Sequence, residues 1–211
     1  MKILIAIPAL DTVPVPFMTS LMALERPEGT QVSMVLNSLT YLARGQLAMR
    51  AIEGGYDYIL WLDSDMVFAP DTLLRLLDDV KDGKEFVSGI YFSRHLPTAP
   101  IICKELNVEQ SERGWDSSQE VYVDYPKDSV FEIAGSGFGV CITSVELFKK
   151  ITAAYRMSPF TPIPTLGEDY SFCYRAKECG ATLYCDSRIK CGHVGTITYN
   201  EEMWLSQRVE K

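Results

Sequence analysis

Apolar residues recur along the chain in short runs whose composition predicts β-strands. Several of these runs are apolar at every position, without alternating polar residues. Strands of that kind are covered on both faces, as in α/β sheets. The predicted strands span residues 2–7, 31–36, 57–62, 85–92, 100–103, 131–134, 138–142 and 182–185.

The segments between these runs carry helical signals. Leu39, Ala43 and Leu47 are spaced by one helical turn, and Leu73, Leu76 and Leu77 share another helix face. The predicted helices span residues 38–53, 71–82, 144–156 and 168–179.

The early order is strand, loop, strand, helix, strand, helix, strand. It predicts an α/β fold with a mostly parallel central sheet. We expect one domain over residues 1–211, in which the polar segment 104–129 is a surface excursion and 194–211 is a C-terminal segment able to move.

Composition narrows the class of protein. With 211 residues, 47% of them apolar, the chain can bury a sizeable core. A net charge of −8 argues against non-specific attraction to nucleic acid or anionic membranes, although a local basic patch remains open. No apolar run reaches the roughly 18 residues of a membrane span. The start "MKILIAIPALD" is interpreted as a strand, not a signal peptide.

The six cysteines include no C-x-x-C pair, and a spacing of six residues between four of them matches no zinc motif. We therefore expect free thiols in a reducing compartment and a cytoplasmic protein.

Asp63 and Asp65 follow the predicted strand 57–62 directly. Ligands of open α/β sheets bind beyond the carboxyl ends of the strands, and two carboxylates there can hold Mg²⁺ or Mn²⁺. The alternative is a polar turn before the next helix, since aspartate is common in both turns and helix starts.

Two further groups of residues could take part in chemistry. Glu168 and Asp169 begin a predicted helix, where an ionised carboxylate could accept a proton from a hydroxyl nucleophile or could simply stabilise the helix. His193, one of two histidines, lies between glycines and could bind a metal ion or be a solvated loop residue. His95 is expected to be such a loop residue.

The stretch "AGSGFGV" is glycine-rich but lacks the spacing of a dinucleotide-binding fingerprint. Gly135 and Gly137 could let the backbone approach a ligand, or they could mark kinks at a strand edge.

In their order along the chain, these motifs resemble the GT-A glycosyltransferases, and most closely the family 2-like enzymes that use nucleotide-sugars. The resemblance runs from the first predicted strand to His193. It rests on the segments "IPALD", "ARGQLAMRAIEGGYDYILWLDSDM", "GSGFGV", "GEDYSFCYRAKECG" and "GHVG". It implies a single-domain GT-A fold, the nucleotide-diphospho-sugar transferase sandwich.

The resemblance also implies roles for individual residues. Asp65 would bind a Mn²⁺ or Mg²⁺ ion directly, Asp63 would contact the ribose or the metal through water, and His193 would be the third residue of the metal site. Asp169 would be the catalytic base, with Glu168 as its neighbour or substitute. Further contacts implied for the nucleotide and sugar involve Pro8, Asp11, Arg44, Ser64, Gly135, Ser136, Gly137 and, less strongly, Arg94.

The implied reaction is transfer of a hexose from a nucleotide-diphosphate donor, with a UDP-sugar favoured, to an acceptor hydroxyl with inversion. The Q-x-x-R-W stretch of processive synthases is absent, which argues against a polymerising synthase. We also expect one of the segments 158–166 and 194–211 to become ordered over bound donor.

Alternatives are a nucleotidyltransferase, although "IPALDTVPVP" lacks a phosphate loop, or a non-catalytic module that binds a nucleotide or sugar. The acceptor could be a saccharide, a protein or a hydroxylated DNA base. The acidic charge disfavours nucleic acid.

Overall fold

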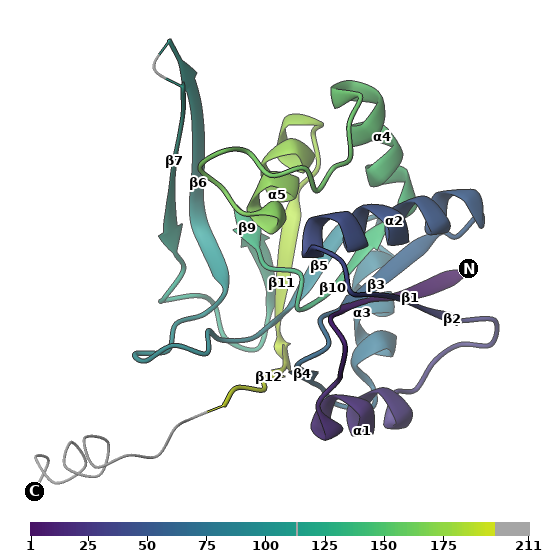
Figure 1. Cartoon of the computed structure of the whole chain (residues 1–211). Helices are drawn as coiled ribbons and strands as arrows, with labels where there is room; N and C mark the ends of the chain where they lie inside the picture. Colours follow the sequence, from purple (N-terminus) through teal and green to yellow (C-terminus); the bar gives the residue numbers. More distant parts are fainter. Residues whose placement is uncertain (113, 197–211) are drawn as a thin grey trace, which may run out of the picture.

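The computed structural model describes residues 1–112 and 114–196 (Figure 1). The expectation of a mobile C-terminal segment therefore falls mostly on residues outside the described part. The elements are β1 (Ile3–Ala9), α1 (Val15–Ala23), β2 (Gln31–Leu36), α2 (Thr40–Glu53), β3 (Tyr58–Leu62), β4 (Met66–Val67), α3 (Thr72–Val80), β5 (Phe86–Ile90), β6 (Ile102–Ser111), β7 (Gly114–Val121), β8 (Val130–Ile133), β9 (Gly135–Ser136), β10 (Val140–Ser144), α4 (Val145–Tyr155), α5 (Glu168–Glu178), β11 (Leu183–Lys190) and β12 (Gly192–His193).

A seven-stranded sheet with the order β2-β1-β3-β10-β5-β11-β8 forms the centre of the molecule. Strands β2, β1, β3, β5 and β11 run in one direction, and β10 and β8 run in the opposite direction. The predicted α/β fold with a mostly parallel sheet is thereby confirmed.

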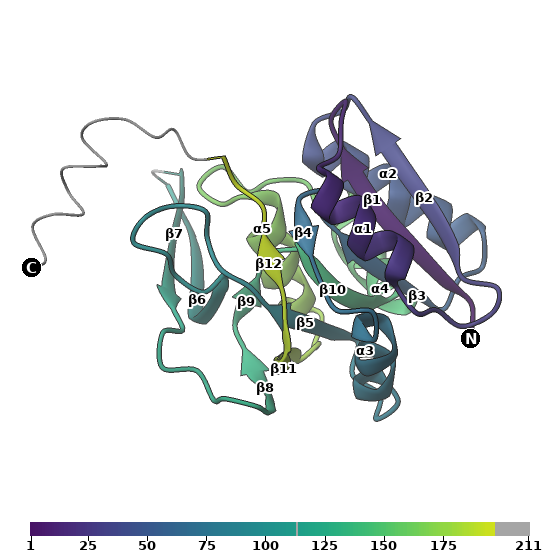
Figure 2. The same cartoon turned by 90° about the horizontal axis from the view of Figure 1, so that it is seen from below.

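Helices cover both faces of this sheet because its strands are apolar on both sides. Every residue of β1 is buried, and the strand divides its side chains between two apolar clusters. Leu4 and Ala6 pack with the cluster that contains residues of α2, α4 and α5, whereas Ile3, Ile5 and Ile7 pack with residues of α1 and α3. Figures 1 and 2 show these two helical layers on opposite sides of the sheet.

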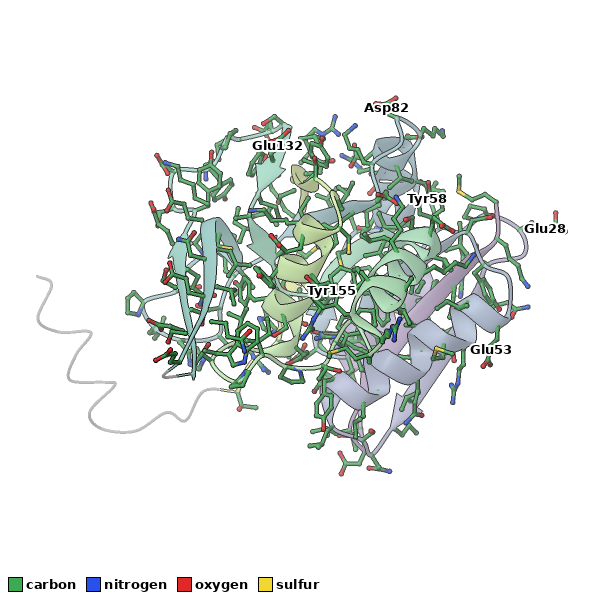
Figure 3. All side chains as sticks on the ribbon, turned by 90° about the horizontal axis from the view of Figure 1, so that it is seen from above. Glu28, Glu53, Tyr58, Asp82, Glu132 and Tyr155 are labelled. Carbon is green, nitrogen blue, oxygen red and sulfur yellow. The ribbon has the colours of Figure 1, made fainter. Side chains whose placement is uncertain are left out.

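Charged side chains lie mostly at the periphery. Seen from the side of α2 and α4, Glu53, Asp82 and Glu132 point outward from the rim of the molecule (Figure 3), and all three are exposed. This distribution makes the buried charges beside the sheet edge, described below, an exception.

The parallel strands bring distant parts of the sequence to one edge. Strands β1, β3 and β5 end at Ala9, Leu62 and Ile90, and β11 ends at Lys190. Just beyond, β12 pairs with β4, so that His193 lies opposite Met66. The chain after β11 is thus fixed against the residues that follow β3.

One helix was not predicted. Residues 15–23 were expected to be loop, but they form α1, whose first turn contains Pro16. Proline is tolerated in a first helical turn, where its missing N–H has no intrahelical partner. Phe17 and Leu21 then bury one side of this helix beneath the sheet.

The polar segment 104–129 contains regular structure. Strands β6 and β7 form an antiparallel hairpin, and β6 also pairs with β9, which gives a separate three-stranded sheet with the order β7-β6-β9. Most residues of β7 are exposed, and the hairpin projects from the body of the molecule (Figure 1). Because few of its positions are apolar, hydrophobic alternation did not reveal it.

Two further observations concern the cysteines and the length of the helices. All six cysteines are free thiols. Within residues 1–112 and 114–196, no helix combines the length and apolar character that crossing a membrane requires.

Candidate active site

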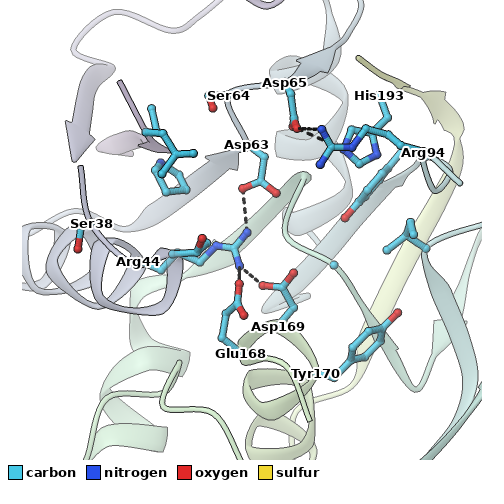
Figure 4. Close-up of a pocket in the computed structure, with 17 residues that line it drawn as sticks. Ser38, Arg44, Asp63, Ser64, Asp65, Arg94, Glu168, Asp169, Tyr170 and His193 are labelled. Carbon is cyan, nitrogen blue, oxygen red and sulfur yellow. Dashed lines mark hydrogen bonds and ion pairs between the residues drawn. The ribbon is translucent and has the colours of Figure 1, made fainter. Parts of the chain in front are cut away.

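A cavity of about 410 Å³ opens at the carboxyl edge of the parallel strands. Its wall combines residues from the ends of β1, β3 and β5 with the first residues of α5 and with β12 (Figure 4). The lining residues are Pro8, Ala9, Leu10, Ser38, Thr40, Arg44, Asp63, Ser64, Asp65, Tyr91, Arg94, Ile101, Gly137, Glu168, Asp169, Tyr170 and His193.

The turn Asp63-Ser64-Asp65 is fixed by its backbone. The Asp63 N–H donates to the carbonyl of Gly139 at 2.9 Å, and the Asp65 carbonyl accepts from Val194 N at 2.8 Å. The two aspartates therefore keep their positions relative to β10 and to the chain that follows β12. Their side chains point toward different partners (Figure 4).

The Asp63 side chain belongs to a buried cluster centred on Arg44. The guanidinium of Arg44, on α2, contacts Asp63 Oδ1 at 2.8 Å, Glu168 Oε1 at 2.8 Å and the carboxylate of Asp169. The Arg44 side chain is 1% exposed, so burial disfavours its charged form, but the three carboxylates more than compensate and raise its pKa. One arginine thus connects α2, the end of β3 and the start of α5.

Asp169 has the environment of a proton acceptor. Burial raises the pKa of its carboxyl to about 7, because the effect of Arg44 in the opposite direction is offset by the negative charges of Asp63 and Glu168. Its second oxygen accepts from the N–H of Phe138 at 3.2 Å. A carboxylate with a pKa near neutrality, held at the wall of a cavity, suits general base catalysis.

Asp65 lies in a separate, more open group with Arg94 and His193. Arg94 Nη1 contacts Asp65 Oδ2 at 2.8 Å, and His193 Nε2 lies 3.5 Å from the same oxygen. His193 Nδ1 lies 3.0 Å from the carbonyl oxygen of Phe92. Since a carbonyl only accepts hydrogen bonds, Nδ1 carries the proton in the neutral ring, and the unprotonated Nε2 lies on the side of Asp65.

This arrangement partly fits a divalent cation. A carboxylate and an imidazole lone pair that converge on one point are suitable ligands for Mn²⁺, and the carbonyl of Phe92 provides the usual outer partner of a metal-bound histidine. Across residues 1–112 and 114–196, however, no group of three His, Cys, Asp or Glu side chains could hold a metal ion. Any ion at Asp65 and His193 would need further ligands from water or substrate.

The glycines of "GSGFG" make room for aromatic side chains. A Cβ at Gly137 would overlap the hydroxyl of Tyr91, and one at Gly139 would lie 2.8 Å from Tyr91 Cζ. The Gly139 N–H also donates to the Tyr91 hydroxyl at 3.0 Å. Within the structure, these glycines thus allow close packing of a tyrosine that lines the cavity.

Most of the residues singled out in the sequence come together here. The cavity lining includes Pro8, Arg44, Asp63, Ser64, Asp65, Arg94, Gly137, Glu168, Asp169 and His193. Three others do not line it: Asp11 is exposed beyond the end of β1, and Gly135 and Ser136 are buried in β9. Arg44, expected to approach a base or diphosphate, lines the cavity and pairs with three carboxylates.

Sequence reasoning missed several lining residues, among them Ser38, Thr40, Tyr91 and Tyr170. Tyr91 follows β5 directly, so the end of another parallel strand was the available signal. Tyr170 follows Glu168 and Asp169 in the first turn of α5.

No protein-family model and no curated protein sequence matches this chain. Among solved structures, it is similar to A197 from STIV, with 19% identity, a TM-score of 0.68, and coverage of 93% of this chain and 87% of that one. It is also similar to GalNAc-T7, crystallised with UDP, GalNAc and Mn²⁺, with 11% identity and a TM-score of 0.59; the match covers 93% of this chain and 44% of that one.

At these identities, the similarities establish the fold alone. The GT-A-like fold implied by the sequence is confirmed, whereas membership of a family 2-like group remains a prediction.

Proposed function

We propose that this protein is a metal-dependent glycosyltransferase that moves a hexose from a UDP-sugar to an acceptor hydroxyl with inversion. One observation carries the proposal: Asp63, Asp65, Glu168, Asp169 and His193 line the same cavity, although they come from three distant parts of the sequence. The GT-A-like fold and the UDP and Mn²⁺ bound to GalNAc-T7 support the choice of donor and ion.

Asp169 is the proposed general base. Its raised pKa, about 7, lets the carboxylate take a proton from the acceptor hydroxyl and release it near neutral pH. The hydroxyl oxygen attacks the anomeric carbon as the bond to the diphosphate breaks, through a transition state with oxocarbenium character. Attack opposite the leaving group inverts the anomeric centre.

Arg44 supports this role without contacting substrate. Its guanidinium holds the Asp169 carboxylate, while the Phe138 N–H fixes the other oxygen at 3.2 Å. Asp65 and His193 would hold the divalent ion, which when bound supplies Lewis-acid neutralisation of the diphosphate leaving group. Asp63 is left to contact the ribose or an ion-bound water.

Thermal-shift measurements with UDP-, GDP- and dTDP-sugars, with and without Mn²⁺, test the proposal. A ligand that binds the native state raises the unfolding temperature by mass action. We expect a UDP-sugar to stabilise the wild type only when Mn²⁺ is present, and Asp65→Ala to lose this effect.

Asp71→Ala is the matched control. Asp71 lies six residues from Asp65, pairs with Arg75 at 2.6 Å and does not line the cavity. Its variant should retain the full metal-dependent shift. Equal stabilisation of Asp65→Ala and the wild type would overturn the assignment of the ion site.

A further inference from the structure

Arg94 covers the carboxylate that the proposed function assigns to the metal ion. It lies in the loop between β5 and β6, and its Nη1 contacts Asp65 Oδ2 at 2.8 Å. The arginine stem runs beside the chain after β12, where a Cβ added to Gly195 would lie 3.3 Å from Arg94 Cδ. Figure 4 shows Arg94 and His193 on the same side of the cavity, both directed toward Asp65.

The guanidinium and a metal ion would require the same oxygen. Asp65 Oδ2 is the atom that Arg94 contacts, and it is also the atom 3.5 Å from His193 Nε2. Asp65 Oδ2 thus pairs with the guanidinium and also lies near a second electron-pair donor, the imidazole of His193. A guanidinium neutralises the carboxylate, but a divalent ion can bind the carboxylate and the imidazole together.

The contact with Arg94 can be exchanged. The Arg94 side chain is 48% exposed and Asp65 is 24% exposed, so water can solvate both groups once they separate. The second polar contact of the guanidinium, to the carbonyl of Val194, is long at 3.4 Å. Displacing Arg94 therefore requires no rearrangement of buried groups.

We propose that Arg94 is an internal cation that masks Asp65 in the ion-free protein and is displaced when a divalent ion binds; this rests on the proposed function. Ion binding and the Arg94–Asp65 contact exclude one another. The released guanidinium remains at the cavity wall, where it can contact the diphosphate of the donor. Arg94 thereby lowers the affinity of the protein for the divalent ion before the donor binds. Once displaced, it raises the affinity for the donor.

Calorimetric titration with Mn²⁺ alone tests the first part. Arg94→Gln removes the competing charge, so we expect it to bind Mn²⁺ about two- to fivefold more tightly than the wild type, the range expected for loss of a partly exposed ion pair. Arg75→Gln is the matched control, because Arg75 is 51% exposed and pairs with Asp71 at 2.6 Å away from the cavity. It should bind Mn²⁺ as the wild type does.

Titration with UDP at saturating Mn²⁺ tests the second part, the contact of Arg94 with the donor diphosphate. Here Arg94→Gln is expected to lower the affinity instead of raising it. Arg94→Gln should bind UDP more weakly than the wild type, whereas Arg94→Lys should retain most of the affinity. Mn²⁺ affinity that is unchanged or lower in Arg94→Gln, while Asp65→Ala abolishes Mn²⁺ binding, would overturn the masking role and leave the ion site intact. Equal Mn²⁺ binding by Asp65→Ala and the wild type, or no Mn²⁺ binding by any variant, would overturn both proposals.

Discussion

Two arginines contact the neighbouring aspartates of Asp63-Ser64-Asp65, and they differ in nearly every physical respect. Arg44 is 1% exposed and serves three carboxylates, whereas Arg94 is 48% exposed and serves one. Arg44 projects from a helix packed on the sheet, and Arg94 from a loop at its edge. The first is a structural counter-ion, and the second is a replaceable one.

The comparison explains how two aspartates one residue apart can have separate tasks. Asp63 joins the cluster that holds Asp169, while Asp65 faces the cavity with His193. A buried arginine that connects three segments is costly to remove, because its three carboxylate partners would repel one another without a counter-ion. An exposed arginine contributes little stability and can leave when a stronger cation arrives.

The largest effect is expected from Arg44→Met. Removing the guanidinium leaves three carboxylates without their shared counter-ion, which should lower the free energy of unfolding by about 3–5 kcal/mol. Chemical denaturation monitored by circular dichroism measures it. The double variant Arg44→Met/Glu168→Gln should recover part of the lost stability, because one negative charge is gone. A loss below about 1 kcal/mol in Arg44→Met alone would show that the Arg44 cluster does not stabilise the fold.

Asp169→Asn should affect chemistry rather than stability. Loss of the general base should lower the rate of sugar transfer by about 10²- to 10⁴-fold. Binding of UDP with Mn²⁺ should be nearly unchanged, because the assigned ion ligands are intact. Glu168→Gln serves as the comparison and should retain more activity; turnover near that of the wild type in Asp169→Asn would refute the base.

A third arginine, Arg188, lies between Arg44 and Arg94 in the number of carboxylates with which it pairs. It contacts Asp79 at 2.9 Å and Asp186 at 2.8 Å, so one cation serves two carboxylates. Burial, together with the charge of Asp186, raises the pKa of Asp79 to about 6 from an ordinary value of 3.8. The folded protein therefore binds this proton more tightly than the unfolded chain does.

The protonated Asp79 therefore contributes fully to the free energy of unfolding below about pH 4. This contribution is lost as the pH rises through about 6. Denaturation at a series of pH values should show that Asp79→Asn flattens this decline between pH 4 and 6. Asp78→Asn, at a neighbouring position that is 70% exposed and paired with Lys81, is the control and should leave the pH dependence unchanged. Identical pH profiles for Asp79→Asn and the wild type would contradict the shared-counter-ion account.

The smallest effect is expected from Arg94→Gln. Because the Arg94–Asp65 pair is partly exposed, its loss should change the free energy of unfolding by at most about 1 kcal/mol. The same denaturation experiment measures it beside Arg44→Met. A loss as large as that of Arg44→Met would mean that Arg94 is a fixed structural element.

The core of the fold could be predicted from the sequence because strands buried on both faces leave an uninterrupted apolar signal, as in β1 and β3. Helix α1 was missed because Pro14 and Pro16 resemble a loop until tertiary packing buries Phe17. The β6–β7 hairpin was missed because its exposed faces carry no apolar alternation. In both regions, the deciding information lies in contacts rather than in local pattern.

Many residues that line the candidate site could be predicted to lie together, but not the partners of their side chains. Motif order indicated Asp63, Asp65, Asp169 and His193 as neighbours at the sheet edge. That Arg44 would be buried among carboxylates depends on how the fold brings α2 near the first residues of α5, which is not encoded in spacing along either helix. The pairing of Arg94 with Asp65 likewise depends on the path of the loop after β5.

The most direct test of the central claim is release of UDP from a UDP-sugar, measured with a panel of saccharide, peptide and hydroxylated-oligonucleotide acceptors. The wild type with Mn²⁺ should release UDP together with formation of a glycosylated acceptor. EDTA, Asp65→Ala and Asp169→Asn should each stop it. Release that is unaffected by EDTA or by these variants, or no release with any donor and acceptor, would contradict the account.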